Sequence, residues 1–266
     1  MNAISIDVED WYHCLDQDPA NWDGYEDRIA GSVRGILEIF DRASTKATFF
    51  VLGHVARRHP ELVEEIHRAG HEVASHGTDH RFVYRQTPDE FERDVARSVE
   101  LLTDVTGQPV RGYRAPYFSI TRQSLWALAV LRKLGFAYDS SIFPVVNHRY
   151  GIPGARRLVH ETESGVIEVP LSTDRVGGVN LPCSGGVYFR VLPYRLVIAM
   201  LRRLQRRGEP IVFYLHPWEI DGGQPRIPLP RALRARHYAG LDRCGPKLAR
   251  LLREFQFGPI RQMLNL

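Results

Sequence analysis

His76 and His80 are the residues of this sequence whose type and spacing most clearly suggest chemistry. They lie in the stretch Ser-His-Gly-Thr-Asp-His at positions 75–80. Two imidazoles four residues apart lie on the same side of one helical turn, where both can reach one cation. Zinc is the ion that imidazole nitrogens hold most readily, with carboxylates completing the shell. Two surface histidines on a polar loop would have the same spacing, so other residues must decide between these interpretations.

Three carboxylates, Asp7, Glu9 and Asp10, lie at the end of the first strand-like run, residues 3–8. Strand alternation puts Asp7 and Glu9 on one face and the apolar residues of this run on the other. Carboxylates this close repel one another unless a cation or an arginine balances them. Because Asp7 falls within an apolar strand, we interpret the group as a ligand set rather than as an acidic cap of the next helix.

A lone arginine and a further histidine follow two other strand-like runs. Arg114 comes after residues 110–113 in an aromatic, apolar setting, where an unpaired buried charge is costly, so we expect a carboxylate partner. His216 ends the most apolar run, residues 211–215, and precedes a proline. Each also fits a structural role, a salt bridge for Arg114 and a hydrogen-bonded core position for His216.

These residues belong to a repeating order of strands and helices. Strand-like runs occupy residues 3–8, 47–52, 72–74, 110–113, 136–138, 167–171 and 211–215, and amphipathic helices are expected at residues 29–43, 55–69, 88–106, 121–134 and 193–207. The alternation implies parallel strands, and about seven such units favour a closed (β/α) barrel over an open sheet. Functional residues of such folds collect at the carboxyl ends of the strands, which is where these candidates fall.

We therefore predict one α/β domain over residues 1–266, a distorted (β/α)7-type barrel. Core motifs would lie in residues 3–143 and 208–220. Residues 144–190 are rich in glycine, proline and β-forming residues, which predicts an inserted β-rich segment over the barrel mouth. Residues 227–266 would form a helical extension, with its last helix at residues 237–257.

The composition is typical of a globular chain. It has 35 Lys and Arg against 31 Asp and Glu, and its arginine-rich helical stretch lacks the stacking aromatic residues of a nucleic-acid interface. Three separated cysteines argue against a disulfide framework or a thiolate zinc site. Without a signal peptide or a membrane-spanning run, we expect a cytoplasmic protein that is not integral to a membrane, with peripheral association and oligomeric state left open.

Five motifs together resemble those of the polysaccharide deacetylases, the nodulation-factor-deacetylase-like group of carbohydrate esterase family 4. In chain order they are Asp-Val-Glu-Asp at 7–10, His-x-x-x-His at 76–80, Arg-x-Pro-Tyr at 114–117, Tyr-Asp-Ser-Ser at 138–141 and Leu-His at 215–216. The resemblance covers nearly the whole chain. It extends to the branch found with exopolysaccharide and exosortase gene clusters, through the stretches at 7–11, 185–190 and 213–219.

The resemblance implies a role for each matched residue. Asp7 would be the general base, held by Arg114, and His216 would be the general acid. His76 and His80 would bind the metal, and a backbone N–H near Tyr117 would help bind the oxyanion. Further residues that could contact the sugar, or simply pack at the mouth, are Trp11, Tyr117, Phe118, Tyr188, Arg190 and Trp218, with Asp139 and Glu219 in support.

The sequence departs from the family pattern at three positions. Val8 stands where most members have the second of two adjacent aspartates, which leaves Glu9 or Asp10 as the third metal ligand. Alternation favours Glu9, whereas Asp10 has the commoner side-chain type. Gly77 replaces a hydroxyl residue. Ser141 lies in a motif that lacks its usual second aspartate, so the orientation of His216 should rest on other partners.

The resemblance implies a metal-dependent hydrolase that removes N-acetyl groups from an amino-sugar polymer, or its precursor, in exopolysaccharide biosynthesis. Zn²⁺ would be the metal, although Co²⁺ or Ni²⁺ could also occupy such a site. We expect Asp7 and His216 on opposite sides of the bound acyl group. Two alternatives stay open, hydrolysis of a cyclic amide, as in allantoinase-like relatives, and glycan binding without catalysis.

Overall fold

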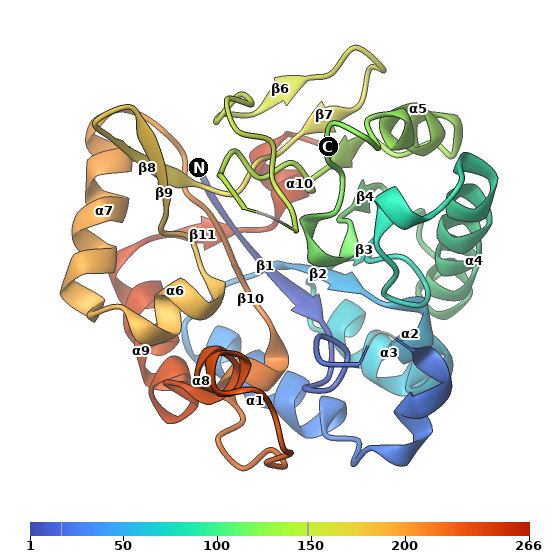
Figure 1. Cartoon of the computed structure of the whole chain (residues 1–266), viewed down its shortest axis with the longest axis horizontal. Coiled ribbons are helices and arrows are strands. Elements are labelled where there is room, and N and C mark those ends of the chain that lie inside the picture. The colour runs from blue at the N-terminus through green and yellow to red at the C-terminus, as the bar shows by residue number, and fades with distance from the viewer. Residues whose placement is uncertain (17, 148) are drawn as a thin grey trace.

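The computed structural model describes residues 1–16, 18–147 and 149–266, and its centre is a curled, mostly parallel sheet (Figure 1). The strand order is β10-β1-β2-β3-β4-β5-β7-β6, with β11 also paired to β1, and only β6 and β7 run antiparallel. The bounds are β1 Asn2–Val8, β2 Thr48–Val51, β3 Glu72–Ser75, β4 Gly112–Tyr113, β5 Tyr138–Asp139, β6 His160–Glu161, β7 Ile167–Glu168, β10 Val212–Leu215 and β11 Phe257–Gly258.

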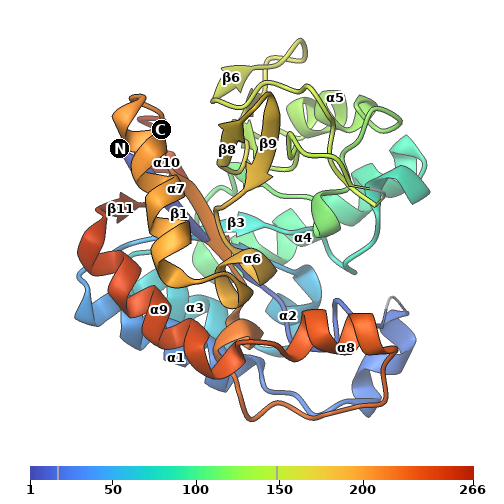
Figure 2. The same ribbon diagram turned by 60° about the vertical axis from the view of Figure 1, so that its left-hand side comes forward.

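Helices surround the strands, as Figure 1 shows for α1, α4, α7 and α9. The helices are α1 Ile29–Arg42, α2 Gly53–Arg58, α3 Pro60–Arg68, α4 Pro88–Thr106, α5 Trp126–Lys133, α6 Gly186–Val191, α7 Tyr194–Arg206, α8 Arg231–Tyr238, α9 Leu241–Glu254 and α10 Ile260–Met263. Figure 2 shows α6, α7 and α9 on the same side of the molecule. Apolar faces of the helices and strands pack into one large core cluster, which hides the sheet from solvent.

The sheet does not close through regular strand pairing between β7 and β10. Instead, the Ser172 N–H donates to the Val212 carbonyl at 3.2 Å, and the Tyr214 N–H donates to the Ser184 carbonyl at 2.9 Å. These contacts join the chain after β7 to β10, where a regular barrel would have a strand. The α/β fold predicted from the alternating elements is therefore confirmed, in the form of a distorted (β/α) barrel.

Three predicted helices differ from the observed ones. The helix expected at 121–134 begins only at Trp126, after a turn in which the Thr121 N–H donates to the Ser124 hydroxyl. The expected helix at 55–69 is divided into α2 and α3, because Pro60 disfavours a helical conformation at His59, which has φ −134° and ψ 57°. The helix expected at 237–257 begins only at Leu241, after Gly240 adopts a left-handed φ of 76°. The prediction of one continuous helix was therefore wrong at 55–69 and at 237–257, because single residues interrupt an otherwise periodic apolar pattern.

The segment expected as a cap, residues 144–190, contains two hairpins, and its His148 lies outside the described residues. The β6–β7 hairpin joins the main sheet through β5. The β8–β9 hairpin (β8 Thr173–Val176, β9 Val179–Pro182) forms a separate two-stranded sheet and leads into α6. Among the described residues, no helix combines the length and the apolar character needed to cross a bilayer.

A buried pair of carboxyl groups joins β5 to β7. Asp139 and Glu168 lie opposite each other in the strand register and are both 0% exposed. The Ser141 hydroxyl donates to Asp139 Oδ1, and the Ile142 N–H donates to Glu168 Oε1, while Asp139 Oδ2 and Glu168 Oε2 are buried without a donor from elsewhere in the described residues. Burial raises the pKa of Asp139 to about 6, and burial together with the Asp139 charge raises the pKa of Glu168 well above its usual value. The pair therefore holds a proton in the folded state.

This shared proton should make the folded state less stable as the pH rises. The unfolded carboxyl groups lose their protons near their ordinary pKa values, so the stabilisation is complete below those values and is lost as pH rises through the raised pKa. One extra proton in the folded state corresponds to about 1.4 kcal/mol of unfolding free energy per pH unit. Urea unfolding from about pH 5 to 7 should show a steeper fall for the wild type than for Glu168→Gln. Equal slopes would contradict a shared proton.

Candidate metal centre and active site

Strand β1 carries the carboxylates into the middle of the sheet, because it lies between β10 and β2 (Figure 1). Its apolar residues, such as Ile6 and Val8, enter the main core cluster. Asp7 and Glu9 point to the other side, as the alternation predicts, and both are nearly fully buried. Partners from other strand ends must therefore balance their charges.

Glu9, His76 and His80 converge within the fold. Glu9 Oε1 lies 3.0 Å from His76 Nε2 and 2.9 Å from His80 Nε2. All three side chains are at most 4% exposed. The other nitrogen of each ring faces a backbone carbonyl. His76 Nδ1 lies 2.7 Å from the carbonyl oxygen of Arg114, and His80 Nδ1 lies 3.1 Å from that of His13. The carbonyls orient each ring so that its Nε2 atom faces the carboxylate.

These contacts suit a cation. A nitrogen that faces a carbonyl carries the hydrogen, so each neutral ring directs the Nε2 lone pair at Glu9. Lone pairs facing a carboxylate oxygen repel one another unless a positive charge, either protons or a metal ion, lies among them. Two imidazoles and a carboxylate, with carbonyls bound to the far nitrogens, are the ligand set and supporting contacts of a protein zinc site. The residues present therefore fit a divalent metal.

The two histidines do not lie on a helix, so that basis for the prediction was wrong. His76 directly follows β3, and the chain then turns through left-handed conformations at Gly77, with φ 72°, and His80, with φ 52°. A Cβ atom at Gly77 would approach Asp94 Oδ2 to 2.9 Å. The turn brings both rings to Glu9, and it explains why a glycine fits where family members have a hydroxyl residue.

Asp10 does not join this cluster. Its Oδ1 accepts from the Trp11 N–H at 2.7 Å and its Oδ2 from the Arg28 N–H at 2.7 Å. The carboxylate thus organises the loop after β1 and points away from the histidines. Between the two alternatives for the third ligand, the geometry favours Glu9.

Arg114 holds Asp7 in a fully buried ion pair. Its Nη1 donates to Asp7 Oδ1 at 2.6 Å and to the Ser5 hydroxyl at 2.7 Å. Its Nη2 and Nε donate to the hydroxyl and the carbonyl of Ser140. The guanidinium also lies 4.2 Å from the centre of the Phe50 ring. All three guanidinium nitrogens of Arg114 donate hydrogen bonds, so the group holds Asp7 Oδ1 in place and leaves Oδ2 on the side of His216.

His216 is oriented by Glu219 and Arg190. The Nδ1 atom of His216 lies 3.1 Å from Glu219 Oε2, and Arg190 Nε donates to Glu219 Oε1 at 2.6 Å. Burial lowers the pKa of His216, but the nearby carboxylates outweigh it and raise the pKa to about 9. Burial raises the pKa of Glu219, yet Arg190 and His216 reduce it to about 2. His216 Nε2 is left facing Asp7 Oδ2 at 4.0 Å and Glu9 Oε1 at 3.8 Å.

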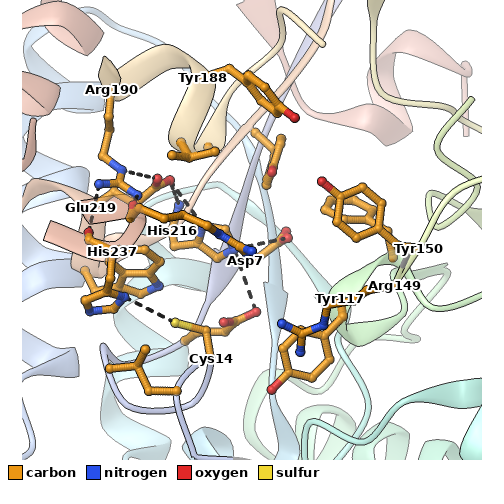
Figure 3. Close-up of a pocket in the computed structure, with 18 of the residues that line it drawn as sticks. Asp7, Cys14, Tyr117, Arg149, Tyr150, Tyr188, Arg190, His216, Glu219 and His237 are labelled. Carbon is orange, nitrogen blue, oxygen red and sulfur yellow. Dashed lines mark hydrogen bonds and ion pairs between the residues drawn. The ribbon is translucent and has the colours of Figure 1, made fainter. Parts of the chain in front are cut away.

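A pocket opens above these residues (Figure 3). The predicted substrate residues Tyr117, Phe118, Tyr188 and Trp218 line it. Arg190 also lines it, but besides Glu219 it donates to three backbone carbonyls and so positions His216 rather than substrate. Trp11 does not reach the pocket, because the loop turns it into an aromatic cluster where its indole N–H donates to the Glu26 carbonyl.

Asp139 lies in the carboxyl pair below the site. Its partner Ser141 accepts the Ala115 N–H at 2.7 Å, next to Arg114. Asp139 thus contacts the loop after β4 rather than His216. The partner that orients His216 in place of the missing second aspartate is Glu219.

Family comparison agrees with this geometry. Residues 15–138 match the model for the family described as polysaccharide deacetylase. Over these residues, a little under half of the chain, the protein is similar to the polysaccharide deacetylases. Residues 140–265 match a second model, described as a domain of unknown function (DUF3473). The deacetylase part supplies His76, His80 and Arg114, whereas the second part supplies His216, Glu219 and Arg190.

Curated relatives include named deacetylases, and solved structures share the fold. The chain is 36% identical over 110 residues to a peptidoglycan deacetylase of Helicobacter pylori, a match that covers 40% of this chain and 36% of that protein. It is 27% identical over 187 residues to a chitooligosaccharide deacetylase of a Bradyrhizobium strain, covering 68% of this chain and 80% of that protein. A solved structure from Mycobacterium smegmatis, provisionally described as a polysaccharide deacetylase, has the same fold, with a TM-score of 0.67, 22% identity and 99% and 88% of the two chains covered.

Beside the deacetylase motifs, the pocket contains a cysteine–histidine contact that the sequence did not reveal. Cys14 Sγ lies 3.6 Å from His237 Nδ1, and His237 Nε2 lies 2.8 Å from Gln224 Oε1. The arrangement has the composition of a nucleophilic triad. However, burial raises the pKa of Cys14 far above its usual value and lowers the pKa of His237 to about 3. A thiolate–imidazolium pair is therefore disfavoured, and Cys14 remains a neutral thiol.

The metal centre predicts different effects for the two neighbouring carboxylates. Glu9→Gln removes the charged oxygen between the imidazoles. Loss of a residue that only supports a ligand typically weakens metal binding by about 10-fold to 100-fold. Loss of the ligand itself should weaken Zn²⁺ binding by at least that much. Asp10→Asn keeps only one of the two oxygens that accept backbone N–H groups, but it leaves Glu9 and both imidazoles in place, so it should bind Zn²⁺ as the wild type does. Metal content after dialysis, with circular dichroism to check folding, measures both. Loss of metal in Asp10→Asn alone would reverse the assignment.

The neutral state of Cys14 predicts that Cys14→Ser keeps acetate release from an N-acetylated oligosaccharide close to the wild-type rate. Serine can still donate to His237, so the pocket wall should be preserved. Removal of a catalytic nucleophile lowers the rate by several orders of magnitude. A loss of that size in Cys14→Ser would show that Cys14 takes part in covalent catalysis.

Proposed function

We propose that this protein is a metal-dependent N-deacetylase of an amino-sugar polymer or its precursor. The observation that carries the proposal is the meeting, in one buried site, of the Glu9–His76–His80 cluster with Asp7 and His216. A divalent ion bound by the cluster would supply Lewis-acid chemistry for amide hydrolysis. The remaining steps fall to residues of the chain itself.

Asp7 is suited to be the general base. One of its oxygens is occupied by Arg114, so the other is the acceptor for a proton of the attacking water. The 4.0 Å between Asp7 Oδ2 and His216 Nε2 is too short for an acyl carbon to lie between them. We therefore replace the expected arrangement on opposite sides with one in which both groups face the acyl group from the same wall.

His216 is suited to be the general acid. Glu219 holds the imidazole through Nδ1, which leaves Nε2 to deliver a proton to the departing amine nitrogen. Arg190 prevents Glu219 from turning away. The contacts from Arg190 to Glu219 and from Glu219 to His216 thus fix the orientation of the imidazole that donates the proton.

The N–H of Tyr117 is a candidate oxyanion donor. No acceptor in the described ranges hydrogen-bonds it, although neighbouring N–H groups at Phe118 and Ser119 are paired. Tyr117 has a left-handed φ of 57°, and its side chain is fixed by a hydrogen bond to the His13 carbonyl and by stacking on Phe82. A rigid donor of this kind typically contributes on the order of 10²–10³ in rate.

The substrate class follows from the pocket and from the relatives. Tyr117, Phe118, Tyr188 and Trp218 offer aromatic surface of the kind that packs on sugar faces. The named relatives act on peptidoglycan and on chitooligosaccharide, both N-acetylated glycans. A role in exopolysaccharide biosynthesis rests on the motif resemblance.

The proposal predicts acetate release from N-acetylglucosamine oligomers by the Zn²⁺-loaded protein. Asp7→Asn should lower the rate by on the order of 10²–10⁴-fold, because the base is lost while the metal ligands remain. Asp10→Asn is the matched control and should stay active. Full activity in Asp7→Asn would contradict the mechanism, and turnover of cyclic ureides in place of acetylated oligomers would contradict the substrate class.

A further inference from the structure

Two arginines stand on facing walls of the pocket. Arg149 lies next to Tyr117 and Tyr150, across from His216 and Glu219 (Figure 3). Arg236 lies on the other wall, since its backbone carbonyl accepts the Nη2 hydrogen of Arg190 at 3.0 Å. Both line the pocket, and neither belongs to the five deacetylase motifs.

The position of Arg149 is set by aromatic rings. Its guanidinium carbon lies 5.4 Å from the centre of the Phe82 ring and 5.5 Å from that of Tyr117. These two rings stack on each other with their centres 4.1 Å apart. Such cation–π contacts hold a guanidinium in place while leaving its N–H groups free to bind an anion.

Neither arginine has a carboxylate partner among the residues that the structure describes. The other charged side chains of the pocket are compensated, Asp7 by Arg114, Glu219 by Arg190 and His216, and Glu9 by the histidines. Among the described charged side chains that line the pocket, Arg149 and Arg236 are therefore the ones without a partner of opposite charge.

The charges of both arginines act on the same point. Tyr150 lies on the wall of Arg149, and Tyr188 also lines the pocket (Figure 3). Burial raises the pKa of Tyr150 to about 12, while the positive charges of Arg236 and Arg149 oppose that rise. All four of these side chains line the pocket, and each carries hydrogen-bond donors.

We propose that Arg149 and Arg236 bind an anionic group, a carboxylate or a phosphate, on the glycan whose acetamido group reaches Asp7 and His216. This inference rests on the proposed function and specifies its substrate as an acidic N-acetylated glycan or a phosphate-bearing precursor. Guanidinium groups bind both kinds of anion through paired, charge-assisted hydrogen bonds. The tyrosine hydroxyls can complete the contacts with the sugar.

Three oligomers of equal length test this proposal. One is neutral N-acetylglucosamine, one alternates N-acetylglucosamine with glucuronate, and one carries a terminal phosphate. Acetate release gives kcat/KM for the wild type, Arg149→Gln, Arg236→Gln and Arg231→Gln. Arg231 is the charge-matched control, because it is exposed on α8 and does not line the pocket.

The wild type should prefer one of the anionic oligomers, chiefly through a lower KM, and the preferred one identifies the source of the anion. The preference over the neutral oligomer should fall about tenfold or more in Arg149→Gln and in Arg236→Gln, the loss expected for a charge-assisted hydrogen bond. It should persist in Arg231→Gln. No preference in the wild type, or an equal preference in all four proteins, would overturn the proposal.

Calorimetric binding of the same oligomers separates this inference from the proposed function. Tighter binding of an anionic oligomer that depends on Arg149 and Arg236, without acetate release, would contradict the deacetylase proposal but support the anion site. Acetate release with binding that is independent of charge would support the deacetylase and overturn the anion site.

Discussion

The site depends on one constraint, the carboxylate oxygen of Glu9 that faces two imidazole nitrogens at about 3 Å. Such a contact persists in a buried setting only with a positive charge among the three groups. It fixes the end of β1 against the turn after β3. The turn after β3 requires the left-handed conformations at Gly77 and His80. Local backbone geometry, the placement of the ligands and the need for a cation are therefore parts of one arrangement.

Around this centre two buried carboxylates, Asp7 and Glu219, are each matched by an arginine from a distant part of the chain. Arg114 joins Asp7 to the end of β5 through Ser140, and Arg190 joins Glu219 to the loop after α8. The second half of the chain, which matches a domain of unknown function, thus supplies the acid candidate, the groups that orient it and one wall of the pocket. A deacetylase domain ending near residue 138 would lack all of these.

The sequence was most informative where a pattern is local. Alternation along β1 correctly separates Asp7 and Glu9 from the core, and the order of elements predicts the α/β fold. Contacts between distant residues could not be read in this way. Pairing of Glu168 with Asp139 follows from strand register, and the approach of Arg149 and Arg236 follows from a loop and a helix that no periodicity connects. Trp11 shows the reverse error, since a residue next to the site in sequence is turned away by the hydrogen bonds of Asp10.

The most direct test of the account is anomalous diffraction at the zinc absorption edge from crystals of the Zn²⁺-loaded protein. The account predicts one strong peak, with His76 Nε2, His80 Nε2 and a Glu9 oxygen as the protein ligands at about 2.0–2.2 Å. A peak coordinated by Asp10 instead, or by other residues far from Asp7 and His216, would contradict it.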